Sequence, residues 1–269
     1  NTTWVASTSP DVANQTIEYY SDSCTTSVTS VTLAAGVTTH NFTSGSNGNT
    51  YYFQITSTDT AGNATDSPCS ATSITIDTVF PTAADTIAWA ETSPVSNTAI
   101  TSTWASGGSA DIANHRVDFY DDGTCSGSVA SSNLESALAL SSSFSGTNAT
   151  THSYKVITID TAGNETQSLC SNAIVIDTDA PSDATLLTWT EGTSSNTSPV
   201  EATWLVSGST DKVSQQIDFY QSATCGGVAM DTTTLATNIN TFTFNSAVSN
   251  NSYSYKILAA WFIKSIFNF

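Results

Sequence analysis

Aspartate residues recur at fixed steps along the chain, and their carboxylates have the clearest capacity for chemistry. Asp11, Asp111 and Asp211 are 100 residues apart, and Asp77 recurs as Asp177. Carboxylate oxygens suit calcium, which takes about six to eight oxygen ligands in a flexible shell. The repeated acids therefore predict a calcium site wherever the fold brings several of them together.

Cysteines form a second repeated set. Cys24 and Cys69 are 45 residues apart, and so are Cys125 and Cys170, whereas a partner of Cys225 at this spacing would lie near position 270. This spacing predicts one disulfide per repeat, formed in an oxidising compartment, and each would stabilise its repeat by about 4 kcal/mol. Two alternatives stay open, namely buried free thiols and pairing between neighbouring repeats, such as Cys69 with Cys125.

Aromatic residues follow the same period, which sets the size of the folding unit. Trp4, Trp104 and Trp204 are separated by 100 residues, about the length of one small domain. We therefore predict three modules, at residues 1–78, 79–178 and 179–269.

The two outer modules depart from the repeat. Asn1 aligns with residue 101, so the first strand of the first module is expected to be missing. In the third module the run LAAWFIKSIFNF, from Leu258, replaces the expected turn, cysteine and final strand. A frameshift, a truncated end or a divergent strand would each account for this run. Because the third module lacks a closing strand and a disulfide, we expect it to be the least stable.

The composition excludes several function classes. The chain has 23 acidic and 5 basic residues, for a net charge of −18. Such a surface repels phosphates and anionic lipid headgroups, so we expect no nucleic-acid binding. Hydrophobic residues make up 39%, enough to fill sandwich cores, but no apolar run is long enough for membrane insertion of this segment.

Strand patterns are clearest in the second module. In HRVDFY, alternation puts Val117 and Phe119 on one face of a strand, with Asp118 and Tyr120 on the other. Short runs of this kind, separated by Gly, Ser, Asn and Asp, predict an all-β sandwich. The predicted strands are 86–90, 99–105, 115–120, 153–160 and 172–177, with two or three weaker strands within 128–146.

Several motifs carry a family resemblance. Trp104, the run YKVITIDTAGN and the exit IDTDAP recur in part as YYFQITSTDTAGN and IDTVFP. Together they resemble the bacterial Ig-like and fibronectin type III-like modules strung in arrays on adhesin-type surface proteins. The resemblance implies a secreted or cell-surface stalk, often stiffened by calcium, whose partners are neighbouring modules and a host or surface glycan or protein ligand.

The topology of an Ig-like sandwich predicts where the acids meet. Two of its loops share one end with the linker that enters the module, so repeated acids are expected at module junctions. The first junction would hold Asp77, Asp111 and Asp160, with Asn164 near by. The second would hold Asp177, Asp179 and Asp211, and this site would be weak or absent because Trp261 takes the place of Asp160.

A structural interpretation of the same residues stays open. Asp and Asn favour turns because they hydrogen-bond their own backbone, Gly163 suits a positive φ, and Pro181 stiffens a linker. In that case the acids would form turns without binding a cation.

Catalysis and sugar binding are the remaining alternatives. The three histidines occupy different positions in their modules, and no catalytic motif is present, which argues against an enzyme. Tryptophans could stack on sugars, as in an accessory module of a larger secreted enzyme. Trp104 and Trp204 lie within alternating strands and are expected in the core, whereas Trp89 and Trp189 lie near strand edges.

Overall fold

The computed structural model describes residues 1–261, and every regular element in this range is a β-strand. The chain divides into two compact units. Unit 1 comprises residues 1–83, 107–115 and 157–167, and unit 2 comprises the rest of the described chain. The names module 1, module 2 and module 3 are kept for residues 1–78, 79–178 and 179–269, whose boundaries stay a prediction.

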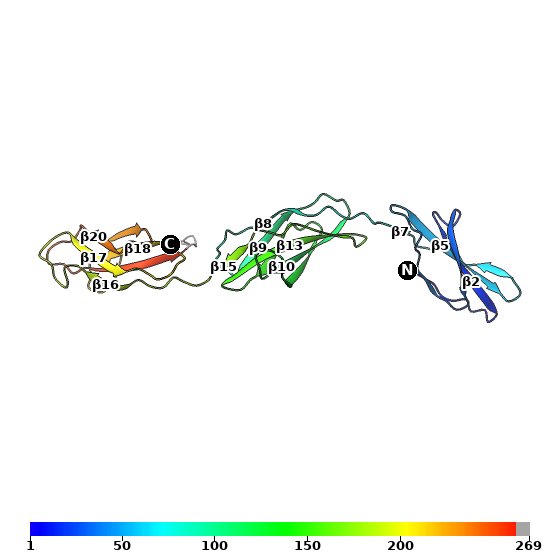
Figure 1. The fold of residues 1–269 in the computed structure, drawn as a ribbon, viewed down its shortest axis with the longest axis horizontal. Coiled ribbons are helices and arrows are strands. Elements are labelled where there is room, and N and C mark those ends of the chain that lie inside the picture. The colour runs from blue at the N-terminus through cyan, green and yellow to red at the C-terminus, as the bar shows by residue number, and fades with distance from the viewer. Residues whose placement is uncertain (262–269) are drawn as a thin grey trace. The chain divides into compact units, whose positions relative to one another are not determined.

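Module 2 contains two antiparallel sheets packed as a β-sandwich (Figure 1). Its strands are β8 (Asp85–Trp89), β9 (Ala99–Ala105), β10 (Ile112–Tyr120), β11 (Val129–Ser136), β12 (Ser141–Ser145), β13 (Thr150–Asp160), β14 (Glu165–Gln167) and β15 (Ile174–Ile176). One sheet has the order β12-β9-β8, and the other has the order β11-β10-β13-β14, with β15 also paired to β13. This confirms the predicted all-β fold class of tandem Ig-like or fibronectin type III-like sandwiches.

Predicted and observed strands agree closely in module 2. Strand β9 covers the predicted residues 99–105, and β11 and β12 are the two weaker strands expected within 128–146. Strands β10 and β13 each begin three residues before their predicted starts at 115 and 153. The added residues are the half-buried Ile112–Asn114 in β10 and Thr150–His152 in β13, of which His152 is fully buried.

The core of module 2 lies between its two sheets. Alternate residues of β9 are buried, including Trp104, which is 4% exposed. Val117 and Phe119 of β10, which alternation placed on one face, are fully buried, and Phe119 stacks on Phe144 with ring centroids 4.5 Å apart. Tyr154 of β13 completes this cluster from the same sheet as β10.

Module 1 repeats part of this plan. Its strands are β1 (Thr2–Thr3), β2 (Val12–Tyr20), β3 (Ser27–Ala34), β4 (Thr39–His40), β5 (Thr50–Asp59), β6 (Ala64–Asp66) and β7 (Ile74–Thr75). One sheet has the order β3-β2-β5-β6 with β7 on β5, and the other holds β1 and β4. Within the described residues, module 1 has no counterpart of β8.

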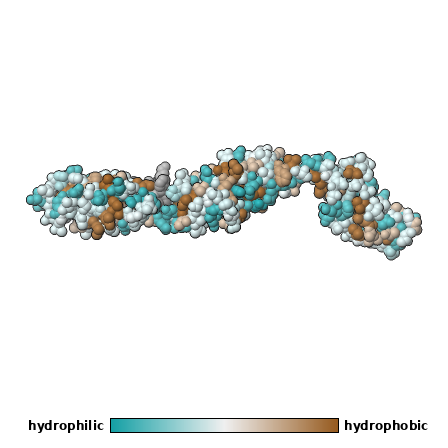
Figure 2. Space-filling model, viewed as in Figure 1, coloured by the Kyte–Doolittle hydropathy of each residue, from teal (hydrophilic) through white to brown (hydrophobic). Residues whose placement is uncertain are grey.

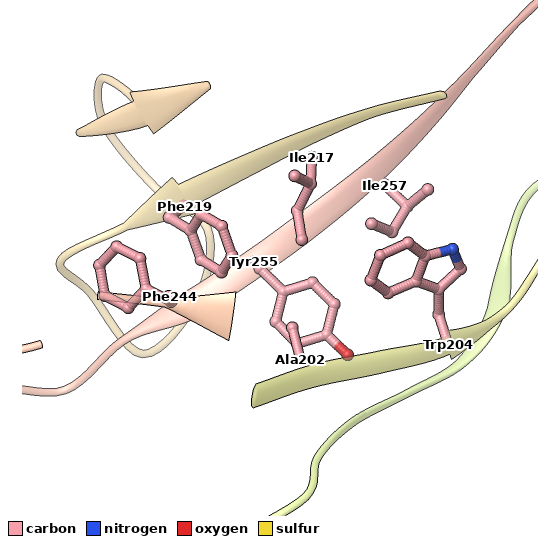
Figure 3. Close-up of a cluster of buried hydrophobic side chains, with 7 residues drawn as sticks. All are labelled: Ala202, Trp204, Ile217, Phe219, Phe244, Tyr255 and Ile257. Atoms are coloured by element: carbon pink, nitrogen blue, oxygen red, sulfur yellow. The ribbon is translucent and has the colours of Figure 1, made fainter. Parts of the chain in front are cut away.

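Module 3 also forms two sheets, in the orders β16-β17-β20 and β19-β18-β21. Its strands are β16 (Thr185–Trp189), β17 (Val200–Leu205), β18 (Lys212–Tyr220), β19 (Asp231–Leu235), β20 (Thr241–Phe244) and β21 (Ser254–Trp261). Figure 3 shows its core side chains gathered between these strands, with Tyr255 close to Trp204 and Phe219. The same positions in the repeat therefore build the same core.

The end of module 3 differs from the sequence expectation at one point. Residues Leu258–Trp261 continue β21 and pair with β18, from Leu258 opposite Gln216 to Trp261 opposite Lys212, with a register shift between Lys212 and Ser214. The departure from the repeat at Leu258 therefore changes the motif without ending the strand. The rest of the aberrant run, residues 262–269, lies outside the described residues.

The surface agrees with the composition. Most of the visible face in Figure 2 is pale or teal, and brown apolar residues occur in separate patches. Residues 1–261 contain no helix of the length and apolarity that crossing a bilayer requires.

Candidate metal site

Asp160 is held in a tight turn at the end of β13. Its Oδ1 accepts hydrogen bonds from the backbone N–H groups of Ala162 (2.9 Å) and Asn164 (2.8 Å), and its Oδ2 accepts one from Asn164 Nδ2 (2.8 Å). Gly163 has a φ of 92°, which an L side chain rarely adopts, so glycine permits the turn. Asp160 is only 2% exposed. The three hydrogen bonds from its own turn fix the position of its carboxylate.

These hydrogen bonds also keep Asp160 ionised. Burial alone would raise the pKa of its carboxyl group, but the hydrogen bonds from Asn164, Ala162 and Gly163 outweigh burial and lower the pKa below its ordinary value. A negative charge is therefore present at this loop at neutral pH.

Asp111 lies just before β10 and is brought beside the turn of Asp160 by the backbone. The N–H of Thr161 donates to the carbonyl oxygen of Asp111 at 2.9 Å. Asp111 is exposed, whereas Asp160 is buried.

Asp77 comes from the linker that leads into β8. Its Oδ1 accepts a hydrogen bond from the N–H of Val79 at 2.9 Å. The side chain of Asn164 also reaches this linker, because Nδ2 donates to the carbonyl oxygens of Asp77 (3.2 Å) and Val79 (3.3 Å). Asn164 therefore connects the turn of Asp160 with the linker.

The structure brings Asp77, Asp111 and Asp160 into one cluster. One carboxylate oxygen from each residue lies within 4.8 Å of the others. All three belong to unit 1, so the linker and both loops form part of the same compact body. Three carboxylates at this separation repel one another, and a divalent cation is the chemistry that such an oxygen cluster supports.

The second predicted set does not assemble in this way. The N–H of Asp179 donates to Asp177 Oδ1 at 3.1 Å, which forms a local turn in the linker. Among the described residues, the cluster of Asp77, Asp111 and Asp160 is the only group of three or more potential ligands at metal-binding separation, so Asp211 does not complete a second one. In module 3 the residue that aligns with Asp160 in the sequence is Trp261, which has no carboxylate.

Module 1 shows that the turn also forms without the linker. Asp59 Oδ1 accepts hydrogen bonds from the N–H groups of Ala61 and Asn63, and Thr60 N–H donates to the carbonyl oxygen of Asp11 at 3.1 Å. The aspartates therefore act as turn residues, as the structural interpretation proposed. In module 2 the carboxylate of Asp77, from the linker, also lies beside this turn.

Both predicted disulfides are present. Cys24 bonds to Cys69 and Cys125 bonds to Cys170, with a sequence separation of 45 in each case. Among the described residues Cys225 is a free thiol, and its N–H donates to Ser254 Oγ at 2.7 Å. Pairing within modules 1 and 2 is confirmed, whereas pairing of Cys69 with Cys125 is wrong.

The residues considered for catalysis or sugar binding are mostly internal. Trp104 and Trp204 are each 4% exposed, which confirms the prediction that they belong to the core. His115 and His152 are fully buried, and His40 Nδ1 lies 2.9 Å from the hydroxyl of Tyr19. Trp104 and Trp204 therefore contribute to the packing of their modules.

Comparisons with solved structures show a likeness in fold. No protein-family model matches the chain, and no curated protein matches it. A solved structure described as the crystal structure of chicken CNTN1 FN1-FN3 domains is similar over 96% of this chain and 87% of that chain, with 15% sequence identity and a TM-score of 0.44.

Proposed function

We propose that the chain is a non-enzymatic, structural or adhesive part of an extracellular or cell-surface repeat protein. Support comes from disulfide-linked sandwiches that recur with one period and from a surface rich in uncharged polar residues. Disulfides persist in oxidising compartments, which favours an extracellular location. The partners of each module would be its neighbours in the same chain and a surface glycan or protein.

We further propose that calcium binds to Asp77, Asp111 and Asp160 and holds the linker on the loops of module 2. The observation that carries this proposal is the approach of three carboxylates, one of them from the linker. The ion would remove the repulsion between them, with backbone carbonyls and water completing its shell. At the second junction, Asp177, Asp179 and Asp211 would bind calcium weakly or not at all.

Thermal melting and calorimetric titration test the calcium proposal. Calcium in excess over a chelator is expected to raise the Tm of the module 2 transition, because a ligand at about 100 times its Kd stabilises the native state by about 2.7 kcal/mol. Asp160→Asn and Asp111→Asn should abolish this increase. The matched control Asp183→Asn changes an exposed carboxylate outside the cluster and should preserve it.

Two results would contradict the proposal. One is a Tm that does not respond to calcium or chelator. The other is a response that survives in Asp160→Asn and Asp111→Asn to the same extent as in the Asp183→Asn control.

A further inference from the structure

An aromatic side chain holds the same loop in each of the three modules. In module 2 the N–H of Thr147 donates a hydrogen bond to Nε2 of His152, with the two nitrogens 3.2 Å apart. In the other two modules the acceptor is a tyrosine hydroxyl at 2.9 Å, and the pairs are Ser46 with Tyr51 and Val248 with Tyr253. A histidine ring therefore takes in module 2 the place of a tyrosine in its neighbours.

His152 is enclosed within module 2. Its side chain is fully buried, and its ring packs edge-on against Phe144 with ring centroids 5.0 Å apart. A Cβ added to Gly146 would lie 2.6 Å from Nε2, so the loop packs closely against the ring. Within the described residues the second ring nitrogen, Nδ1, has no hydrogen-bond partner, although Asp121 Oδ1 lies 3.0 Å away. The bond from the loop thus depends on the lone pair of Nε2.

The charged groups around this ring come from few segments. Among the described residues, Asp121 is the charged group that faces the ring, and its side chain is 60% exposed. The sequences of β12, β15 and residues 146–149 contain no charged residue. Asp122 and Asp177, next to these segments, each accept N–H groups of their own turns. Lys155 lies three residues further along β13, on the opposite face of the strand.

Protonation of the ring conflicts with its contact to the loop. Since Nε2 of His152 accepts a hydrogen bond, the proton of the neutral ring lies on Nδ1. A second proton would lie on Nε2, where it would face the N–H of Thr147, and two donors cannot bond to each other. Asp121 attracts a charged ring whether the loop is held or released, so it does not remove this conflict. A tyrosine hydroxyl accepts the same bond and stays neutral in acid.

The loop held by His152 in turn holds the linker that leaves module 2. Asn148 Oδ1 accepts a hydrogen bond from the N–H of Thr178 at 2.7 Å, and Ala149 N–H donates to the carbonyl oxygen of Ile176 at 2.8 Å. All of these residues belong to unit 2. Because Thr147 directly precedes Asn148, movement of its N–H away from the ring also moves the group that binds the linker.

We propose that His152 makes the anchorage of this linker sensitive to protons, so that acid frees the loop of residues 146–149 and, with it, Thr178. An unperturbed histidine changes its charge between about pH 5 and 8. The released loop allows a proton on Nε2 and the held loop does not, so the released state gains population as the pH falls. In module 1, where Tyr51 is the acceptor, the equivalent bond from Thr78 N–H to Asn47 Oδ1 persists in acid.

Amide hydrogen exchange on the full chain tests this proposal at about pH 7.5 and about pH 5, on either side of the charge change of histidine. Chelator is present throughout, so the outcome is independent of the calcium proposal, and rates are corrected for the pH dependence of intrinsic exchange. Protection of Thr147 and Thr178 is expected to fall about tenfold at the lower pH, because their two hydrogen bonds are lost. Protection of Ser46 and Thr78 in module 1 should not change.

Exchange in β9 and β10 distinguishes release of the loop from unfolding of the whole module. Protection in these strands should be the same at both pH values. A loss that extends to β9 and β10, unchanged protection of Thr147 and Thr178, or an equal loss at Ser46 and Thr78 would each overturn the proposal. These outcomes are read in the unaltered chain and need no variant.

A pair of variants assigns the response to one ring. His152→Tyr installs the residue found at this place in modules 1 and 3, so it should keep the loop bond and abolish the response to acid. The matched control His40→Gln removes a histidine of module 1 and should leave the response at Thr147 and Thr178 intact. A response that persists in His152→Tyr, or that disappears in His40→Gln, would contradict the role of His152.

Discussion

Tyr154→Phe removes one hydroxyl group that joins the two sheets of module 2. The hydroxyl donates towards the carbonyl oxygens of Ala88 (2.7 Å) and Thr103 (2.6 Å), and it accepts from the N–H of Thr103 at 3.1 Å. Tyr154 is fully buried in β13, whereas its partners belong to β8 and β9 of the opposite sheet. Tyr255 makes the equivalent contacts with Thr188 and Thr203 in module 3.

The expected loss of stability follows from the groups left behind. Ala88 keeps a second donor, the hydroxyl of Thr103 at 2.7 Å, so its carbonyl remains bonded. The N–H of Thr103 loses the acceptor that the tyrosine provides. The loss of one net hydrogen bond, together with a part-buried N–H that no longer has this acceptor, is worth about 1–3 kcal/mol. For a module of this size each kcal/mol lowers the Tm by about 4–8 °C.

The same hydroxyl predicts a dependence on alkaline pH. Burial raises the pKa of Tyr154 from 10.0 to about 12. The unfolded chain therefore loses this proton first, so stability is full below about pH 10 and falls as pH rises towards 12. A difference of two pKa units corresponds to about 2–3 kcal/mol, and the phenylalanine variant lacks this contribution.

Urea unfolding followed by hydrogen exchange on fragments of β10 and β13 measures module 2 separately from its neighbours. Tyr52→Phe, at a half-buried tyrosine of module 1, is the control. A loss below about 0.5 kcal/mol at neutral pH would refute the bridging role, because it is smaller than one ordinary hydrogen bond. An unchanged decline above pH 10 in the variant would refute the assignment of that decline to Tyr154.

The remaining predictions concern the linker contact and the order of unfolding. Gly107→Ala would place a Cβ 2.3 Å from the carbonyl oxygen of Thr82, so it should displace the linker and weaken calcium binding at least tenfold. The control Gly226→Ala, whose Cβ would lie 3.6 Å from its nearest neighbour, should leave calcium binding unchanged. Unchanged calcium titration in the first variant would contradict the packing of the linker. Cys125→Ser should destabilise module 2 by about 2–5 kcal/mol in urea. Module 3 should unfold first in the unaltered chain, because Cys225 is free and forms no disulfide there. The predicted order would be contradicted if module 3 unfolded last.

Sequence alone determined the local and periodic properties of this protein. Alternation along HRVDFY placed Val117 and Phe119 on the same face of a strand, because a strand turns successive side chains to opposite faces, and both side chains are fully buried. The spacing of 45 residues paired Cys24 with Cys69 and Cys125 with Cys170. The period also located Trp104 and Trp204 in equivalent cores.

The tertiary structure decided which distant groups meet. Asp77, Asp111 and Asp160 come from a linker and two loops, and their approach depends on the packing of sheets whose strands are far apart in the sequence. The hydroxyl contacts of Tyr154 depend on the distance between those sheets, which no local pattern specifies.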